Sequence, residues 1–326
     1  MNFSNLGNSL LALSFVAVTA CDTQEPAFGE GDVEDRCVGC GGIKLNTNKI
    51  GLHAFSEIDT TGNEHDGVRL KSVVISRGKL DKVTVENGQL IGKIGGSYYQ
   101  GHSFDGSLWT LDVNMSDDPE NAHWVEAIMK ISGSTEDPDY GWKYTFEHQV
   151  LGGPKEFYPN CDKDENLANG EQFDALVTGN ITIADQANLV SRDNTIFIGC
   201  LSGGVGKAGY WGYPKHKVSS NERFTTAVRM VRGDYCGTGD SFTKIGTPVT
   251  VTDTWGFNSL VNNYKLEAVW GEKGAECLYQ PRLINTFRYS DIVHECEGLG
   301  GHVPNECLET DTLANYQGLN YLSGTP

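Results

Sequence analysis

Apolar and polar residues alternate in short runs along the first half of the chain, and Gly, Asn or Asp separates the runs. A period of two is typical of strands that bury one face. Asn87-Gly88 lies between two of these runs, and this dipeptide favours a hairpin turn because both residues take positive φ. The pattern predicts a β-rich domain, either a sandwich or a barrel. The expected strands span residues 68–76, 82–86, 89–94, 108–113, 125–131 and 143–149.

The second half mixes strand patterns with helical ones. Residues 222–232 carry Phe224, Ala227, Val228 and Val231 at helical spacing, which predicts a helix. A second helix is expected over residues 291–296, capped by Ser290. Further strands are expected over residues 194–200, 249–253 and 265–270. The predicted fold class is therefore mainly β with minor α (α+β).

One hydrophobic stretch, residues 10–20, ends at Ala20-Cys21. This pattern is typical of a bacterial lipoprotein signal, which is cleaved before a cysteine that becomes lipidated. Cys21 is therefore the expected lipidation site. A secreted protein with an ordinary signal peptide is the alternative. A transmembrane helix is disfavoured because it needs about 18 or more apolar residues.

The sequence divides into four expected parts. Residues 1–20 form the signal peptide, and residues 21–36 form a flexible acidic tether because they carry six acids and few apolar groups. Gly152-Gly153-Pro154 suggests a boundary between an N-terminal β-rich domain, 37–153, and a cysteine-rich domain, 154–326. The predicted organisation is thus two β-rich, disulfide-stabilised modules after a lipoprotein signal and a tether.

The net charge of the 326-residue chain is −18. A field of this sign repels phosphate backbones and anionic lipid surfaces, so we expect no nucleic-acid partner. Attachment to a membrane would come from the lipid on Cys21. The expected location is the cell envelope, outside the cytoplasm, either at an outer membrane or at the cell surface.

Without Cys21, eight cysteines remain, and an even number outside the cytoplasm predicts disulfides. The sequence does not fix their pairing. The Cys37-Val38-Gly39-Cys40 segment leaves redox and metal-binding roles open beside a structural disulfide, which the glycines favour because they start a helix poorly. The disulfide candidates are Cys37, Cys40, Cys161, Cys200, Cys236, Cys277, Cys296 and Cys307.

Several motifs of known chemistry are incomplete. Residues 204–209 match GxGxxG, but Tyr210 to Pro214 do not continue as a helix pattern, so a glycine-rich turn is expected in place of a dinucleotide site. Asp162, Asp164 and Asn166 alternate as in a calcium loop, but the EF-hand pattern fails, which leaves a looser calcium site or a solvated acidic loop. A zinc set of His294, Cys296, His302 and Cys307 is less simple than disulfides. We therefore expect no cofactor and no metal.

Cys236 is a possible nucleophile, with His216 or His294 as its base. It follows the expected helix 222–232, however, and a helix C-terminus raises the pKa of a thiol, so a disulfide is favoured. We expect no catalytic residue. Aromatic clusters offer stacking surfaces for sugar rings, although most aromatic residues in β domains are core. The clusters are Tyr98-Tyr99 with Trp109, Trp142 with Tyr144, and Tyr210-Trp211 with Tyr213.

Residues 228–237, VRMVRGDYCG, resemble the signature of the ADYC-domain family of bacterial lipoproteins, with Gly233 where the family usually has Ala. The resemblance is strong over residues 159–310, where Glu267-Ala268-Val269-Trp270 supports it, and loose over 37–80, where Asn46-Thr47-Asn48 takes part. It implies an extracytoplasmic, disulfide-stabilised module and no known reaction. The family-motif residues are Arg229, Met230, Arg232, Asp234, Tyr235 and Cys236.

Together these features predict a lipid-anchored envelope protein with a structural or ligand-binding role. Its partners would be the membrane, through the anchor, and an unidentified protein or carbohydrate. The alternative function is a cell-surface hydrolase or thiol enzyme that uses Cys236 and a histidine. An enzyme of this kind should have a cleft where His216, His294 or His302 meets a carboxylate or a free thiol.

Overall fold

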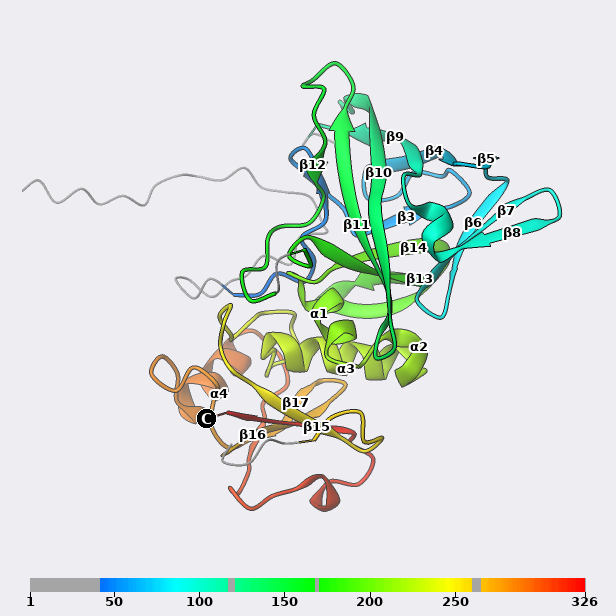
Figure 1. Cartoon of the computed structure of the whole chain (residues 1–326). Helices are drawn as coiled ribbons and strands as arrows, with labels where there is room; N and C mark the ends of the chain where they lie inside the picture. Colours follow the sequence, from blue (N-terminus) through cyan, green and yellow to red (C-terminus); the bar gives the residue numbers. More distant parts are fainter. Residues whose placement is uncertain (1–41, 117–120, 168–169, 260–264, 326) are drawn as a thin grey trace, which may run out of the picture.

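A computed structural model of the chain describes residues 42–116, 121–167, 170–259 and 265–325 (Figure 1). Cys21, the predicted signal peptide, the predicted tether, Cys37 and Cys40 lie outside the described residues. Among the helices that are described, none has both the length and the apolar character needed to span a membrane. Strands clearly outnumber helices, so the prediction of a mainly β fold with minor α is confirmed.

A large antiparallel sheet contains strands at four of the expected alternating runs, 68–76, 108–113, 125–131 and 143–149, and at the expected strand 194–200. The side chains of Trp109, Leu111 and Met129 are buried in its core. In sheet order the strands are β3 (Glu57–Asp59), β14 (Asn188–Cys200), β13 (Asp174–Ala184), β11 (Gly141–Val150), β10 (Trp124–Asp137), β9 (Leu108–Asn114), β4 (Val68–Ile75) and β5 (Gly78–Lys79), with β12 (Tyr158–Pro159) paired to β11.

The sheet continues across the predicted boundary at residues 153/154. Strand β11 precedes this point and β13 follows it, and the two strands pair antiparallel. The sequence signal at Gly152 corresponds to a turn after β11, where Gly152 has φ +88°.

A small sheet of β6 (Lys82–Glu86), β7 (Gln89–Ile94) and β8 (Ser97–Gln100) extends to one side of the large sheet (Figure 1). The predicted hairpin between β6 and β7 is confirmed, with φ +50° at Asn87 and +75° at Gly88. Tyr144 of the large sheet accepts a hydrogen bond from the backbone nitrogen of Leu90, which fixes this sheet to the core. Shorter elements nearby are β1 (Lys49–Ile50), β2 (His53–Ala54) and the 3-10 helix η1 (Gly101–Phe104).

Helix α3 (Asn221–Arg232) lies between the large sheet and a second, five-stranded sheet (Figure 1). Ser220 caps its start and Gly233, with φ +63°, ends it. Residues 224–232 are all buried, because the helix has a sheet on each side. The second sheet runs β15 (Thr250–Asp253), β19 (Tyr321–Thr325), β16 (Lys265–Gly271), β17 (Gly274–Leu278) and β18 (Asn305–Glu306), and the remaining elements are α1 (Gly204–Tyr210), α2 (Lys215–Val218), α4 (Tyr289–Gly298), η2 (Asp185–Ala187) and η3 (Leu313–Asn315).

Two local predictions were wrong. Residues 204–209 form most of helix α1 and not a turn. The glycines permit this helix because a Cβ on Gly206 would clash with the carbonyl oxygens of Gly199 and Cys200, so only glycine lets α1 pack against the end of β14. Helix α4 was predicted to be capped by Ser290 but starts at Tyr289 after Arg288, whose backbone nitrogen donates to Asp291.

Three disulfides are present in the described residues, and all involve predicted cysteines. Cys161–Cys200 joins the segment after β12 to the end of β14. Cys236–Cys296 joins the segment after α3 to α4, and Cys277–Cys307 joins β17 to the segment after β18. Each bond therefore links segments that are distant in sequence and contributes to stability by restricting the unfolded chain.

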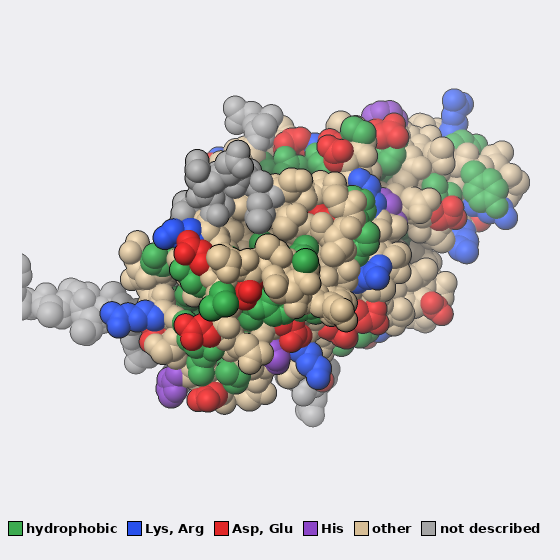
Figure 2. Space-filling view, turned by 90° about the horizontal axis from the view of Figure 1, so that it is seen from below, with side chains coloured by type: hydrophobic (Ala, Val, Ile, Leu, Met, Phe, Trp, Pro, Cys, Tyr) green, Lys and Arg blue, Asp and Glu red, His purple; other side chains and the backbone are tan. Residues whose placement is uncertain are grey.

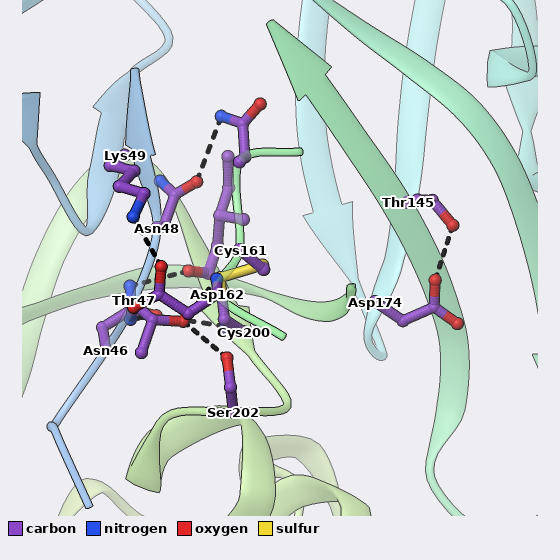
Figure 3. The surroundings of a disulfide bond; sticks show 12 residues. Asn46, Thr47, Asn48, Lys49, Thr145, Cys161, Asp162, Asp174, Cys200 and Ser202 are labelled. Carbon is purple, nitrogen blue, oxygen red and sulfur yellow. Dashed lines mark hydrogen bonds and ion pairs between the residues drawn. A yellow bond between two sulfur atoms is a disulfide. The ribbon is translucent and has the colours of Figure 1, made fainter. Parts of the chain in front are cut away.

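Residues 43–49 form a segment near the start of the described chain, and its residues 46–49 lie beside the Cys161–Cys200 disulfide and Ser202 (Figure 3). Asn46 donates to the Ile198 carbonyl and accepts from the Cys200 backbone nitrogen, so it lies beside the Cys161–Cys200 disulfide. Thr47 bonds Ser202 at 2.6 Å. The Asn46-Thr47-Asn48 motif is thus a structural element that holds the segment against the strand β14 and the start of α1.

Candidate functional site

The signature residues lie at the C-terminal end of α3, and all six are buried. The Arg229 guanidinium contacts the Asp234 carboxylate at 2.5 Å and donates to Asn188 at 2.9 Å. Asp234 also accepts from the backbone nitrogens of Thr238 and Gly239. This part of the motif therefore closes the loop after the helix and links it to the large sheet.

Tyr235 belongs to a second buried cluster. Its hydroxyl donates to Oε1 of Glu267 on β16 at 2.8 Å, and Arg282 contacts the same oxygen at 2.8 Å. Arg282 also donates to the carbonyls of Met230 and Val231, two of the last carbonyls of α3. Burial raises the pKa of Tyr235 well above its usual value, so the phenol keeps its proton and remains a donor.

Arg232 and Cys236 complete the structural role of the signature. Arg232 donates to the carbonyl of Ile43 at 2.8 Å, and Ser241 accepts from the Ile43 backbone nitrogen, so the motif anchors the segment at residues 43–49. Cys236 forms a disulfide with Cys296 and is not a free thiol in this structure. The signature residues connect α3 to both sheets and to the segment at residues 43–49. None of their reactive groups faces solvent.

The two candidate bases of Cys236 lie elsewhere. His294 is an exposed residue of α4, and His216 on α2 lies against the β6–β7 turn at Gly88. The zinc set is not assembled either, since Cys296 and Cys307 belong to different disulfides. In the proposed calcium segment, Asp162 pairs with Lys49 and Asp164 pairs with Lys207, each at 2.5 Å. These carboxylates are neutralised by lysines.

The aromatic clusters are mainly core. Trp109, Tyr144 and Tyr213 are buried, and Tyr98 is the prominent exception at 69% exposure. Trp142 packs over Gly101, where a Cβ would clash with its ring. These clusters do not form an exposed stacking platform, which weakens the carbohydrate hypothesis at these positions.

A groove of about 560 Å³ lies over the second sheet and the start of α3. This volume is within the range of ligand sites. The groove is built from four segments: the first turn of α3, the β16–β17 turn, the stretch after α4 and the residues before β19. Its charged residues are Glu222, Arg223, Glu272, Lys273, Glu276 and His302, and Trp270 and Tyr321 lie at its base.

Acidic and basic side chains both line the groove. Nε2 of His302 lies 3.8 Å from Oε2 of Glu276 and has no hydrogen-bond partner in the described part of the chain. The pKa of Glu222 lies below its usual value because its own backbone amide and the Ser220 hydroxyl donate to it. Beside the groove, the Arg223 guanidinium lies over the ring of Trp255, 5.3 Å from its centroid.

The hydroxyl groups that line the groove already have structural partners. Ser220 accepts from the Arg223 backbone nitrogen, Thr226 donates to the Glu222 carbonyl, and Tyr321 donates to the Arg223 carbonyl. None of these three hydroxyls is hydrogen bonded to a histidine, so the described lining contains no activated nucleophile of the serine type. The arrangement is suited to binding a polar ligand.

Sequence reasoning did not find this groove or the partners Glu267 and Arg282. Glu267 lies in the EAVW stretch that the resemblance includes, which is the one signal that pointed to it. Arg282 belongs to no sequence motif that indicates its role.

Figure 2, which views the molecule from the side of the second sheet, shows acidic side chains spread over this face with basic ones between them.

Comparison with known proteins gives one match. The ADYC domain model matches residues 101–284, which is more than half of the chain and includes the whole signature, α3 and both of its flanking sheets in part. No curated protein and no solved structure matches the sequence. The buried signature network and this match agree, and the chain belongs to the ADYC domain family.

Proposed function

We propose that this protein is a lipid-anchored, extracytoplasmic envelope protein that binds a ligand in the groove at residues 220–226, 270–276, 302 and 318–321. Ala20-Cys21 and the acidic stretch that follows it support the anchor. Three buried disulfides support a location in an oxidising compartment.

The observation that carries the binding role is the groove itself, with charges of both signs and its hydroxyls engaged in the fold. Charges of both signs discriminate between ligands through electrostatic complementarity. A segment of a partner protein that carries both acidic and basic side chains fits this lining better than a sugar, because the aromatic residues at the base, Trp270 and Tyr321, are fully buried.

Mass spectrometry of the mature N-terminus tests the anchor. We expect a diacylated Cys21 as the first residue, and we expect Cys21→Ala to leave the membrane fraction or to remain uncleaved. An unmodified Cys21 inside an uncleaved chain contradicts the proposal.

A photo-crosslinking residue placed at Glu272 tests the groove in intact cells. The matched control is Leu308, which is 69% exposed and does not line the groove. We expect a discrete adduct at Glu272 that the charge reversal Lys273→Glu removes, and none at Leu308. The same adducts at both positions, or adducts that survive Lys273→Glu, contradict a specific groove.

A second candidate function is a cell-surface hydrolase that uses His302 and Glu276. The pair lies in the groove with the two side-chain atoms 3.8 Å apart, which is one arrangement expected of an enzyme. Cys236 takes no part, because it is bonded to Cys296. Hydrolysis of chromogenic ester, amide or glycoside substrates that is lost in both His302→Gln and Glu276→Gln would establish this function, and the absence of turnover would remove it.

A further inference from the structure

A second polar cluster lies at the edge strand β3 of the large sheet and includes none of the residues that line the groove. Glu57 on the edge strand β3 is 1% exposed, and its Oε1 lies 2.6 Å from Nε2 of His65. The same nitrogen lies 3.7 Å from Oδ1 of Asp66. Glu57, His65 and Asp66 each offer one ligand atom, and these atoms all lie within 4.8 Å of one another.

Only one oxygen of the Glu57 carboxylate, Oε1, has hydrogen-bond partners in the described residues. The Thr182 hydroxyl on β13 donates to Oε1, the oxygen that His65 also contacts. Oε2 is buried and has no hydrogen-bond partner in the described residues. A buried carboxylate oxygen without a partner is costly, and such an atom in a folded protein calls for a specific cause such as a bound ion or a proton.

The turn that carries His65 and Asp66 is built to hold them in place. Asp66 and Gly67 have φ +47° and +66°, and His65 forms a bridge with Val68 across them. The Asp66 carbonyl is fixed by His53 at 2.6 Å. The side chain of Asp66 is 39% exposed and that of His65 is 17% exposed, so solvent reaches the cluster from the side of the turn.

We propose that the Glu57 carboxylate, Nε2 of His65 and the Asp66 carboxylate bind one Zn²⁺ ion. Imidazole nitrogen and carboxylate oxygen are ordinary ligands of Zn²⁺, and water completes a site that has three protein ligands. Two carboxylates give the ligand set a charge of −2, which balances the charge of the ion. The ion takes the place of the proton between Glu57 and His65 and joins the edge strand β3 to the turn at residues 65–68. It binds the Glu57 carboxylate, whose Oε2 has no hydrogen-bond partner in the described residues.

Titration of the full chain, purified without a histidine tag and stripped with a chelator, tests the site. The probe is Zn²⁺ in competition with a chromophoric chelator. We expect one equivalent to bind, and we expect at least a tenfold loss of affinity in His65→Asn and in Asp66→Asn. Asp66→Asn is the safer variant for folding because Asn tolerates the positive φ of this position.

The matched control is His102→Asn, which changes a second His–Asp pair, His102 and Asp105, whose histidine side chain is 66% exposed. We expect this variant to bind Zn²⁺ as the unmodified chain does. Absence of a bound equivalent would overturn the proposal. Binding that is unchanged in both His65→Asn and Asp66→Asn would place the ion elsewhere and would overturn it equally.

Discussion

The hydroxyl of Tyr235 donates a 2.8 Å hydrogen bond to Glu267, and both side chains are completely buried. Tyr235 belongs to the cysteine signature and Glu267 to the strand β16, 32 residues further along the chain. The family sequence pattern at Tyr235 and at Glu267 therefore specifies one buried hydrogen bond between the two residues. The signature holds α3 against the second sheet, and this accounts for its residue types without any catalytic role.

We expect Tyr235→Phe to lower the free energy of unfolding by about 1–3 kcal/mol, because Glu267 and the backbone nitrogen of Arg282 both lose a buried partner. Urea denaturation measures the change. Tyr98→Phe is the control, since Tyr98 is 69% exposed and should leave the stability unchanged. Equal stabilities of the two variants would show that the buried network contributes nothing.

We expect replacement of both Cys236 and Cys296 by Ser to destabilise the protein by about 2–5 kcal/mol. Thiol titration of the denatured, unreduced chain should find no free thiol at Cys236. Peptide mapping should recover the bonds Cys161–Cys200, Cys236–Cys296 and Cys277–Cys307. A reactive thiol at Cys236 would revive the thiol-enzyme hypothesis.

We expect Gly206→Ala to cost at least about 2 kcal/mol, because the added methyl group would clash with the carbonyls at the end of β14. The paired control is Gly298→Ala at the end of α4, where a Cβ would meet nothing within 4 Å. This control should be neutral or slightly stabilising. Thermal denaturation compares them, and a neutral Gly206→Ala would refute the close packing of α1.

The contribution of His148 to the stability should fall as the pH drops below about 6.5. Burial lowers the pKa of His148, and its Nε2 accepts a hydrogen bond from the Gly51 backbone nitrogen, which requires the neutral ring. Below the unfolded pKa the unfolded chain binds a proton that the folded chain does not, so the native state loses stability until the folded pKa is reached. At higher pH His148 is neutral in both the folded and the unfolded chain, and the loss of stability disappears.

Denaturation midpoints between pH 5 and pH 8 measure this effect. We expect His148→Gln to flatten the profile relative to the unmodified chain. His102→Gln, at a side chain that is 66% exposed, should leave the profile as it is. A profile that His148→Gln does not alter would assign the pH dependence to other groups.

The sequence predicted the strands, turns and helices that depend on residues close together in the chain. Strands β6 and β7 and the turn at Asn87-Gly88 follow from alternation and from a dipeptide that tolerates positive φ, and α3 follows from its apolar spacing. Helix α1 was missed because its glycines serve packing against β14, which only the tertiary structure reveals. The groove was missed because its four segments carry no shared pattern and meet only when the second sheet forms.

The segment at residues 43–49 has a further consequence for the order of folding. It is synthesised early, yet Ile43 bonds Ser241 and Arg232, which lie 198 and 189 residues later in the chain. Contacts at such separations form late, because much of the chain must be ordered first. The beginning of the described chain is therefore among the last parts to reach its native position. A chain truncated before residue 241 lacks part of the structure to which this segment binds.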